Sequence, residues 1–221
     1  MGKKSINIVW IKRDIRTIDH EAFHVAESMG LPYIPIYIFD SELIKYPDTS
    51  DRHLQFIFDS IIDINSKLSE FNKEVEMFYG SSLKIFDDLL SQFKIENIYS
   101  YQESGIKSTW KRDLKIKSLC ADKEINWTEF QRDGVIRGIK NRKNWNKNWH
   151  IFMHSEIINN SFNKKQKIQN KNNFTLPASF LTKINKNKNI FQPAGETMAW
   201  KYVMSFSEES VKNYAYNISK P

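Results

Sequence analysis

Residues 54–79, LQFIFDSIIDINSKLSEFNKEVEMFY, carry the two patterns that decide the fold. In the first part, apolar side chains recur every three or four positions, so one face of a helix holds Leu54, Ile57, Ile61, Ile64, Leu68 and Phe71. Residues 75–79 follow as a short run of strand-forming residues. This stretch therefore predicts an amphipathic helix that leads into a β-strand.

The same alternation fills the first 130 residues. Short β-branched or aromatic runs occupy residues 6–11, 33–39, 95–101 and 125–130. Gly80-Ser81-Ser82, where a serine can cap a helix, precedes a second helical pattern made of Leu83, Phe86, Leu90 and Phe93. A third helix is expected from about residue 108 to 121. Strands and helices that alternate in this way predict an α/β fold over residues 1–131: a five-stranded, doubly wound parallel sheet, Rossmann-like, with helices on both faces.

Beyond residue 131 the alternation stops, and residues 132–195 are predicted to form an irregular segment and a Lys/Asn-rich interdomain linker. Residues 160–190 hold seven lysines, eight asparagines and no Asp or Glu, a local charge of +7 that equals the net charge of +7 for the whole chain. Such a composition buries little apolar area, so we expect a solvated, poorly ordered linker. The alternative is a basic arm that touches a phosphate backbone.

Residues 196–221 return to a helical pattern. Met198, Tyr202, Met204 and Phe206 give an apolar face, and residues 207–209 can open a second helix. We expect this segment to be the truncated start of a helical domain, most of which would lie beyond Pro221.

Composition narrows the class of protein. The single cysteine, Cys120, excludes an intrachain disulfide framework and suits a reducing compartment. No apolar run approaches the roughly 20 residues of a membrane helix. Residues 1–4 lead into a strand-like run without a signal-peptide pattern. The expectation is a cytoplasmic monomer with no membrane partner.

Residues 20–24, HEAFH, match the H-E-x-x-H pattern of zinc proteases. A third ligand is missing from the expected places, because Glu27 stands where the metzincin pattern has glycine and Glu42 lies beyond a buried strand. We therefore expect no metal site here, but a solvated helix face with Asp19 as its N-cap.

Two other local patterns have plain structural interpretations. His150 and His154 repeat the four-residue spacing beside Trp145 and Trp149, which favours packing over metal binding. Residues 80–82 join a strand to a helix, but neither a G-x-G-x-x-G pattern nor a P-loop lysine-serine pair is present. An ordinary helix cap is the expectation there.

In open α/β sheets, ligands bind beyond the carboxyl ends of the strands. These ends carry polar groups of mixed charge: Lys12-Arg13-Asp14, Asp40, Gly80 and Gln102-Glu103. A small planar or anionic ligand would suit this edge, and the residues alone do not identify it.

Five segments, in order along the chain, resemble the amino-terminal half of the photolyase/cryptochrome family. Residues 9–20, VWIKRDIRTIDH, resemble its opening V-W-F-R-R-D-L-R-x-x-D-N, so the H-E-x-x-H histidine falls at a family helix start. The other four are residues 35–40 (PIYIFD), residues 50–56 (SDRHLQF), residues 103–105 with 110–113 (ESG and WKRD), and residues 205–206 with 214–221 (SF and YAYNISKP).

The resemblance implies a flavoprotein. In this family a helical carboxyl-terminal domain binds FAD, and blue light drives an electron from reduced flavin into a pyrimidine dimer in DNA, which splits. Tyr214, seven residues before Pro221, matches the start of the motif that surrounds the flavin and is the predicted FAD contact. Damaged DNA would bind through the missing domain, so no catalytic residue is expected in this chain and the chain alone should be inactive.

The resemblance also implies a second chromophore, because the α/β domain of family members often holds a folate or deazaflavin antenna. The candidate antenna-binding residues are Asp40, Arg52 and Glu103, all expected at the carboxyl edge of the sheet. An Asp40–Arg52 ion pair that ties strand to helix is the structural alternative. Two other functions stay open: a cryptochrome-type photoreceptor, and a stand-alone α/β nucleotide-binding or adaptor domain.

Overall fold

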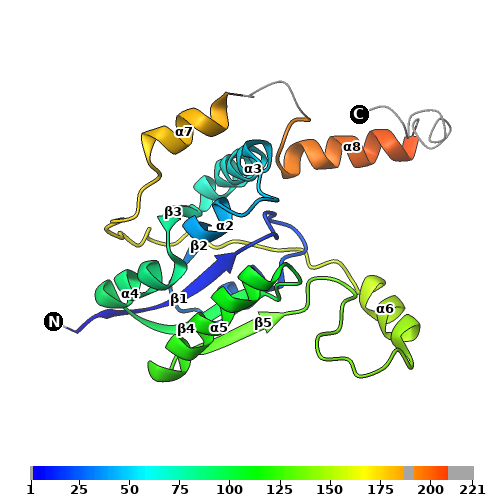
Figure 1. Ribbon diagram of the computed structural model, residues 1–221, viewed down its shortest axis with the longest axis horizontal. Coiled ribbons are helices and arrows are strands. Elements are labelled where there is room, and N and C mark those ends of the chain that lie inside the picture. The colour runs from blue at the N-terminus through cyan, green and yellow to red at the C-terminus, as the bar shows by residue number, and fades with distance from the viewer. Residues whose placement is uncertain (1, 187–191, 209–221) are drawn as a thin grey trace.

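The computed structural model describes residues 2–186 and 192–208, and its centre is a five-stranded parallel sheet (Figure 1). The strands are β1 (Lys4–Ile11), β2 (Tyr33–Asp40), β3 (Glu76–Gly80), β4 (Phe93–Tyr101) and β5 (Asn126–Phe130). Their order is β3-β2-β1-β4-β5, and every neighbouring pair is parallel. The predicted doubly wound α/β fold is confirmed.

Eight α-helices and one 3-10 helix surround the sheet in the described residues. They are α1 (Glu21–Ser28), α2 (Ser41–Ile44), α3 (Asp51–Leu68), η1 (Ser69–Phe71), α4 (Ser82–Gln92), α5 (Lys107–Asp122), α6 (Trp145–Met153), α7 (Ala178–Asn185) and α8 (Glu196–Glu208). None of the helices in these residues is long and apolar enough to cross a bilayer.

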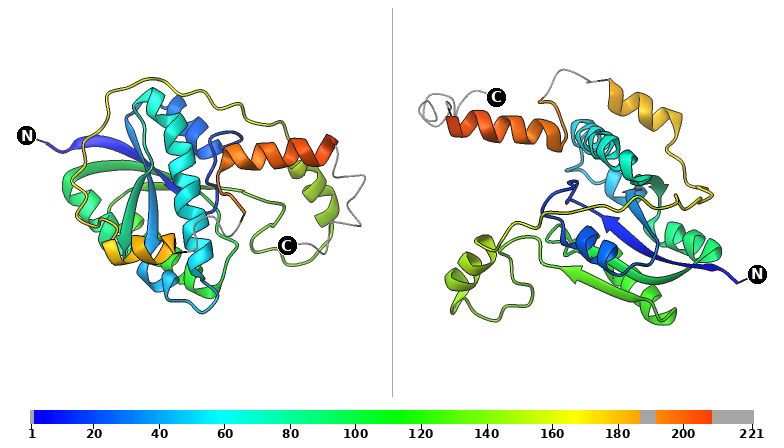
Figure 2. Two further views of the ribbon diagram at one scale, coloured as in Figure 1. Left: turned by 90° about the horizontal axis from the view of Figure 1, so that it is seen from above. Right: turned by 180° about the vertical axis from the view of Figure 1, so that it is seen from behind.

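Alternation along the strands builds two cores, one on each face of the sheet (Figure 2). Ile8 and Trp10 of β1 belong to the core that α4 and α5 cover, where the Trp10 and Phe86 rings meet edge to face at 5.1 Å. Val9 and Ile11 belong to the core that α1 and α3 cover. Because both of its faces are buried, the inner strand β2 is an apolar run up to its last residue, Asp40.

Three expected details of the helices are wrong. Phe93 is the first residue of β4 rather than the last turn of a helix, and Phe71 lies in η1. Asp19 does not cap α1, because it adopts a left-handed conformation (φ 55°) and the cap is His20, whose Nδ1 accepts a hydrogen bond from the Phe23 N–H. His20 is also fully buried, so that position is not a solvated face.

Residues 160–186, the described part of the Lys/Asn-rich segment, are not solvated throughout as their composition predicts. Ile168, Phe180 and Ile184 are buried in the two cores. Residues 170–174 follow the β3 edge, where the Asn172 Nδ2 donates to the Met77 carbonyl and the Tyr79 N–H donates to the Phe174 carbonyl. Figure 2 shows this segment crossing the outside of the sheet, so it covers an edge strand that would otherwise have open backbone groups.

The last part of the chain departs from expectation in one respect. Ser207 and Glu208 continue α8 and do not open a second helix. The predicted FAD contact Tyr214 lies outside the described residues.

Candidate ligand-binding site

A cavity of about 1080 Å³ opens at the carboxyl ends of β1, β2 and β4. Strand order reverses between β1 and β4, so the cavity lies at the switch point where doubly wound sheets bind ligands. Helices α2, α3, α5 and α8 complete its walls. Asp40 and Glu103, two of the three predicted antenna residues, both line it. The third, Arg52, is exposed at the start of α3 and is not among the lining residues.

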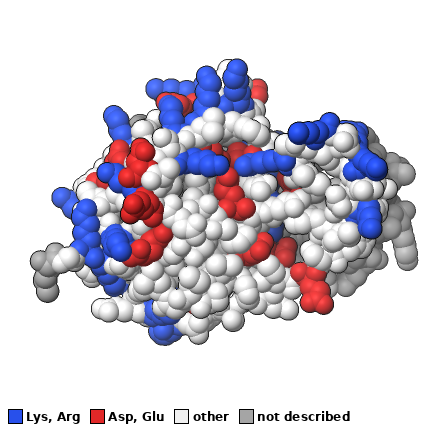
Figure 3. Space-filling model, turned by 90° about the horizontal axis from the view of Figure 1, so that it is seen from below, with Lys and Arg blue, Asp and Glu red and all other residues white. Residues whose placement is uncertain are grey.

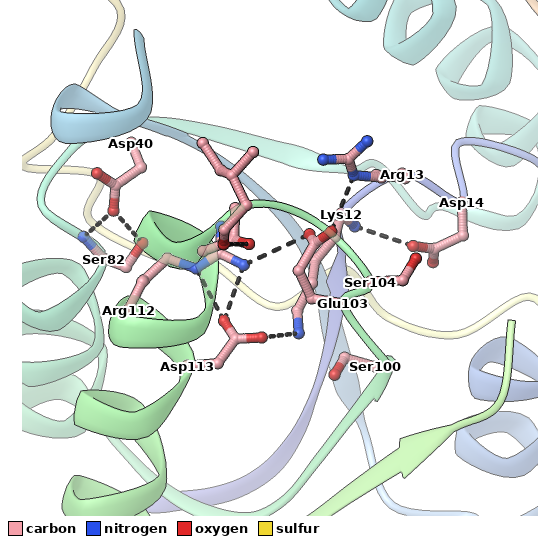
Figure 4. A network of polar contacts seen from close by, with 12 residues as sticks. Lys12, Arg13, Asp14, Asp40, Ser82, Ser100, Glu103, Ser104, Arg112 and Asp113 are labelled. Carbon is pink, nitrogen blue, oxygen red and sulfur yellow. Dashed lines mark hydrogen bonds and ion pairs between the residues drawn. The ribbon is translucent and has the colours of Figure 1, made fainter. Parts of the chain in front are cut away.

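Alternating charges form the polar wall (Figure 4). The buried Glu103 carboxylate lies 2.9 Å from the Arg13 Nε through its Oε1, and 3.8 Å from an Arg112 nitrogen through its Oε2. Arg112 also pairs with Asp113 at 2.8 Å, and Asp113 pairs with the Lys12 Nζ at 3.0 Å. Lys12 also lies 3.8 Å from Glu129, so three cations and three carboxylates alternate in this network and each charge has an opposite partner.

Lys12 is held in this wall by aromatic rings and carboxylates. Its ammonium lies 4.5 Å from the Trp10 ring centroid and 5.1 Å from that of Trp127. Burial lowers the pKa of Lys12, while Asp113 and Glu129 oppose that change. Cation–π contacts and the two carboxylates thus hold the amine in place beneath the cavity.

Asp40 is held by a helix rather than by Arg52. Its Oδ2 accepts hydrogen bonds from the Ser82 N–H (3.0 Å) and the Ser82 hydroxyl (2.5 Å), and its Oδ1 accepts one from the Glu42 N–H. The expected serine cap of α4 is also wrong, because the N-cap Ser81 makes no side-chain bond and Asp40 supplies the acceptor from 42 residues earlier in the chain.

The rest of the lining is largely aromatic and aliphatic. Tyr37 comes from β2, Tyr46 from the loop after α2, and Phe56 and Ile57 from α3. Burial raises the pKa of Tyr37, so its phenol stays protonated and can donate a hydrogen bond. Sequence reasoning missed Tyr37 as a site residue, although its inward position in the apolar run 33–39 was the available signal.

Helix α8 forms a wall that no local sequence signal predicted. The buried Glu196 carboxylate accepts hydrogen bonds from the Thr17 N–H (3.0 Å), the Thr17 hydroxyl (2.6 Å) and the Ile18 N–H (3.1 Å), and it pairs with the Lys67 Nζ at 2.9 Å. Burial alone would raise the pKa of Glu196, but these partners lower it. A Cβ at Gly195 would lie 2.7 Å from the Asp63 side chain, so only glycine allows this approach. The contacts of Gly195 and Glu196 fix the start of α8, and this helix contributes Trp200 and Val203 to the cavity lining.

The first histidine of the H-E-x-x-H segment, His20, stabilises the start of α1. The His20 Nε2 lies 2.8 Å from the buried Asp14 Oδ2, and its Nδ1 caps α1. Burial would raise the pKa of Asp14, but the hydrogen bond from His20 lowers it. His24, one helical turn further on, is exposed. No group of three potential metal ligands occurs within residues 2–186 and 192–208.

This arrangement can bind a planar ligand with polar edges. Aromatic and aliphatic side chains offer flat apolar contact, and Glu103 and Tyr37 offer an acceptor and a donor. Within the described part of the chain, the buried Glu103 Oε1 has the Arg13 ion pair but no hydrogen bond of good geometry, so its capacity as an acceptor is not fully used. Together these observations define a doubly wound α/β domain with a cavity at the switch point of its sheet.

Comparison with known proteins gives the family. Residues 7–146 match the family model described as DNA photolyase. That match covers more than half of the chain, and the chain therefore belongs to the photolyase/cryptochrome family.

Curated relatives include both branches of the family. The chain is 27% identical to Cryptochrome-1 of Drosophila melanogaster over 136 residues, which cover 58% of this chain and 25% of that protein. It is 24% identical to the deoxyribodipyrimidine photo-lyase of Buchnera aphidicola over 236 residues, covering 94% of this chain and 46% of that protein. The chain thus spans between a quarter and a half of these relatives.

Solved structures confirm the fold. A class III photolyase from Agrobacterium tumefaciens superposes with a TM-score of 0.71 at 17% identity, over 98% of this chain and 47% of that one. An archaeal photolyase from Sulfolobus tokodaii, solved with two FAD molecules, superposes with a TM-score of 0.64 at 18% identity, over 86% of this chain and 44% of that one.

Proposed function

We propose that this chain is the amino-terminal domain of a blue-light-driven deoxyribodipyrimidine photolyase, a cytoplasmic, monomeric flavoprotein that repairs pyrimidine dimers in DNA. The observation that carries the proposal is the reach of the photolyase match. The Buchnera photolyase aligns with 94% of the chain, whereas the Drosophila cryptochrome aligns with 58%. An alignment of that reach includes segments beyond the α/β domain.

FAD, held by the part of the protein beyond this chain together with Tyr214, would supply the light-driven electron transfer. The residues of this domain would have a different role, because they would bind and orient a second chromophore. A folate or a deazaflavin fits the cavity of about 1080 Å³ because the aromatic lining suits a planar ring system. Glu103 would accept a hydrogen bond from the ring edge.

Asp40 and Arg52, the other two candidate residues, contribute differently to this proposal. Asp40 lines the cavity, but both of its oxygens already accept hydrogen bonds, so its contribution would be to fix the start of α4 beside the ligand. Arg52 stays a prediction, because it is not among the residues that line the cavity.

Two experiments test the proposal at different levels. For the whole protein, a version that continues past Pro221 should bind FAD and split pyrimidine dimers in DNA under blue light. Tyr214→Phe should weaken its FAD retention, because a phenolic hydroxyl can donate to a phosphate oxygen. A longer protein that cannot be loaded with FAD contradicts the flavoprotein assignment.

For the domain, fluorescence titration should show binding of folate, deazaflavin or FAD, and Glu103→Gln should weaken it at least about tenfold because a charged acceptor is lost. Glu70→Gln, at an exposed position in η1, is the matched control. If neither folate nor deazaflavin binds the longer protein, the antenna role is wrong.

A cryptochrome-type photoreceptor is the second candidate, favoured by the 27% identity to Drosophila Cryptochrome-1. The longer protein separates the two: light-driven flavin reduction without dimer repair would identify a photoreceptor. A stand-alone nucleotide-binding or adaptor domain is the third, and it would bind ligands in the cavity but show no photochemistry.

A further inference from the structure

The structure contains a basic surface that the ligand cavity does not use. Residues 140–148, KNRKNWNKN, form the loop before α6 and its first turns, and they hold four cations, four amides, one tryptophan and no acid. Lys140, Arg142, Lys143 and Lys147 are all exposed. None of these four forms an ion pair with another described residue. In contrast, the nearby Arg132 and Arg137 pair with Asp133 and Glu129.

Figure 3 shows this concentration of charge. Lys and Arg side chains lie at the end of the molecule that carries α6 in Figure 1, and at the opposite end Lys and Arg are mixed with several Asp and Glu side chains. Four like charges within nine residues that hold no acid create a local positive potential that attracts anionic chains.

Aromatic rings line the same helix. Trp145 and Trp149 stack with centroids 6.5 Å apart at an interplanar angle of 29°. His150 meets Trp149 edge to face at 5.0 Å, and His154 follows 5.5 Å further along, which confirms the packing predicted for these residues. The Arg142 guanidinium lies 5.8 Å from the Trp145 centroid. The rings therefore form a ladder beside the four cations.

The ladder is held in place while leaving rings open to solvent. A Cβ at Gly134 would lie 1.9 Å from the Trp149 ring, so this glycine lets the loop pack directly on the indole and anchors α6. No residue of α6 is buried, and Ile151 and Met153 are 63% and 50% exposed. The helix thus projects from the body of the domain, as Figure 1 shows.

We propose that residues 140–154 bind single-stranded nucleic acid. The cations and amides would contact phosphates along the strand, and Trp145 with the histidine rings would stack with bases. A positively charged track beside aromatic platforms is how proteins bind single strands without sequence preference. A single strand fits better than a duplex because bases must leave their own stack to reach the rings. This site is separate from the ligand cavity and needs neither flavin nor light.

The test uses the 221-residue chain in the dark, without added flavin, and fluorescence anisotropy of a labelled oligothymidylate of 20 nucleotides. Binding should weaken steeply between 50 and 200 mM salt. Replacing Lys140, Arg142, Lys143 and Lys147 with Ala should reduce the slope of log affinity against log salt by about 3, because each cation bound to a single-strand phosphate contributes about 0.7. The matched control removes four exposed lysines elsewhere, Lys84, Lys115, Lys117 and Lys123, and should leave the slope nearly unchanged.

Stacking has its own readout. Trp145→Ala should weaken oligothymidylate binding about fivefold or more at constant salt, and Trp145→Phe should restore most of it, because stacking needs a ring rather than an indole N–H. Circular dichroism of both variants checks that the domain still folds. Vesicles of anionic lipid, matched in charge to the oligonucleotide, should bind more weakly than the strand.

Three results would overturn the proposal. The first is an equal loss of oligothymidylate binding in the fourfold variant of residues 140–147 and in its fourfold lysine control. The others are no effect of Trp145→Ala, and tighter binding to vesicles or duplex DNA than to the single strand. None of them bears on the proposed photolyase function, since that function is tested by light-driven repair in the longer protein.

Discussion

Two stretches of this chain have nearly the same composition and opposite structural roles. Residues 160–186 and residues 140–148 are both rich in lysine and asparagine and contain no acid. In the first stretch, Lys167 and Lys183 pair with Glu74 and Asp51, and its asparagines bond to the β3 edge. In the second, the cations face solvent. The difference comes from a few apolar residues: Ile168, Phe180 and Ile184 fix the first stretch to the sheet.

Removing one of these buried apolar residues is the strongest test of this difference between the two stretches. Ile184 is fully buried, so Ile184→Ala should lower the free energy of unfolding by about 2–5 kcal/mol. Ile151→Ala in α6 is the matched control, because Ile151 is 63% exposed and its loss should change stability by less than about 0.5 kcal/mol. Urea denaturation of both variants measures the difference. Equal effects would mean that the first stretch is not anchored as described.

The start of α8 differs from both stretches, because a buried carboxylate, that of Glu196, fixes it to the domain. Glu196→Gln should destabilise the protein by about 1–3 kcal/mol, because it removes charge-assisted hydrogen bonds to Thr17 and Lys67.

The pH dependence of this contact has a defined sign. The folded pKa of Glu196 is lowered below its ordinary value of 4.5, so the stabilisation is complete above that pH and is lost as the pH falls through the folded pKa. Denaturation at pH 7 and at successively lower pH should show the wild type losing its advantage over Glu196→Gln. An advantage that grows as the pH falls would contradict the assignment.

The sheet and its main helices could be predicted from sequence because their signals are local. Strand runs such as residues 33–39 and the helical spacing from Leu54 to Leu68 each determine their own element, and the alternation determines the topology. The carboxyl-edge position of Asp40 and Glu103 followed directly from that topology.

What could not be predicted depends on contacts between distant segments. Asp40 caps a helix that begins 42 residues later, and Glu196 bonds to Thr17 from 179 residues away. Composition also misled the interpretation of residues 160–186, because a few buried residues outweigh many lysines when the asparagines between them find backbone partners.

Those asparagine contacts can be tested singly. Asn172 donates to the Met77 carbonyl and accepts from the Phe174 N–H, so Asn172→Ala should cost about 1–2 kcal/mol. Hydrogen exchange should show faster exchange of the Tyr79 amide, which donates to the Phe174 carbonyl in the same contact. Asn146→Ala, at an exposed position in α6, should leave both stability and exchange unchanged.

The smallest expected effect belongs to the charged pairs of the first stretch. Lys167 and Glu74 pair with both side chains about half exposed, at 57% and 50%. Exposed pairs contribute about 0–1 kcal/mol, since solvent and salt screen the charges and ordering two long side chains costs entropy. Lys167→Ala should therefore lower stability by less than about 1 kcal/mol, and the difference from wild type should shrink further in 0.5 M salt. Lys143→Ala, which removes a cation without a described ion pair, should change stability even less. If Lys167→Ala cost as much as Ile184→Ala, charge rather than burial would hold residues 160–186 on the sheet, and the contrast between the two basic stretches would rest on the wrong interaction.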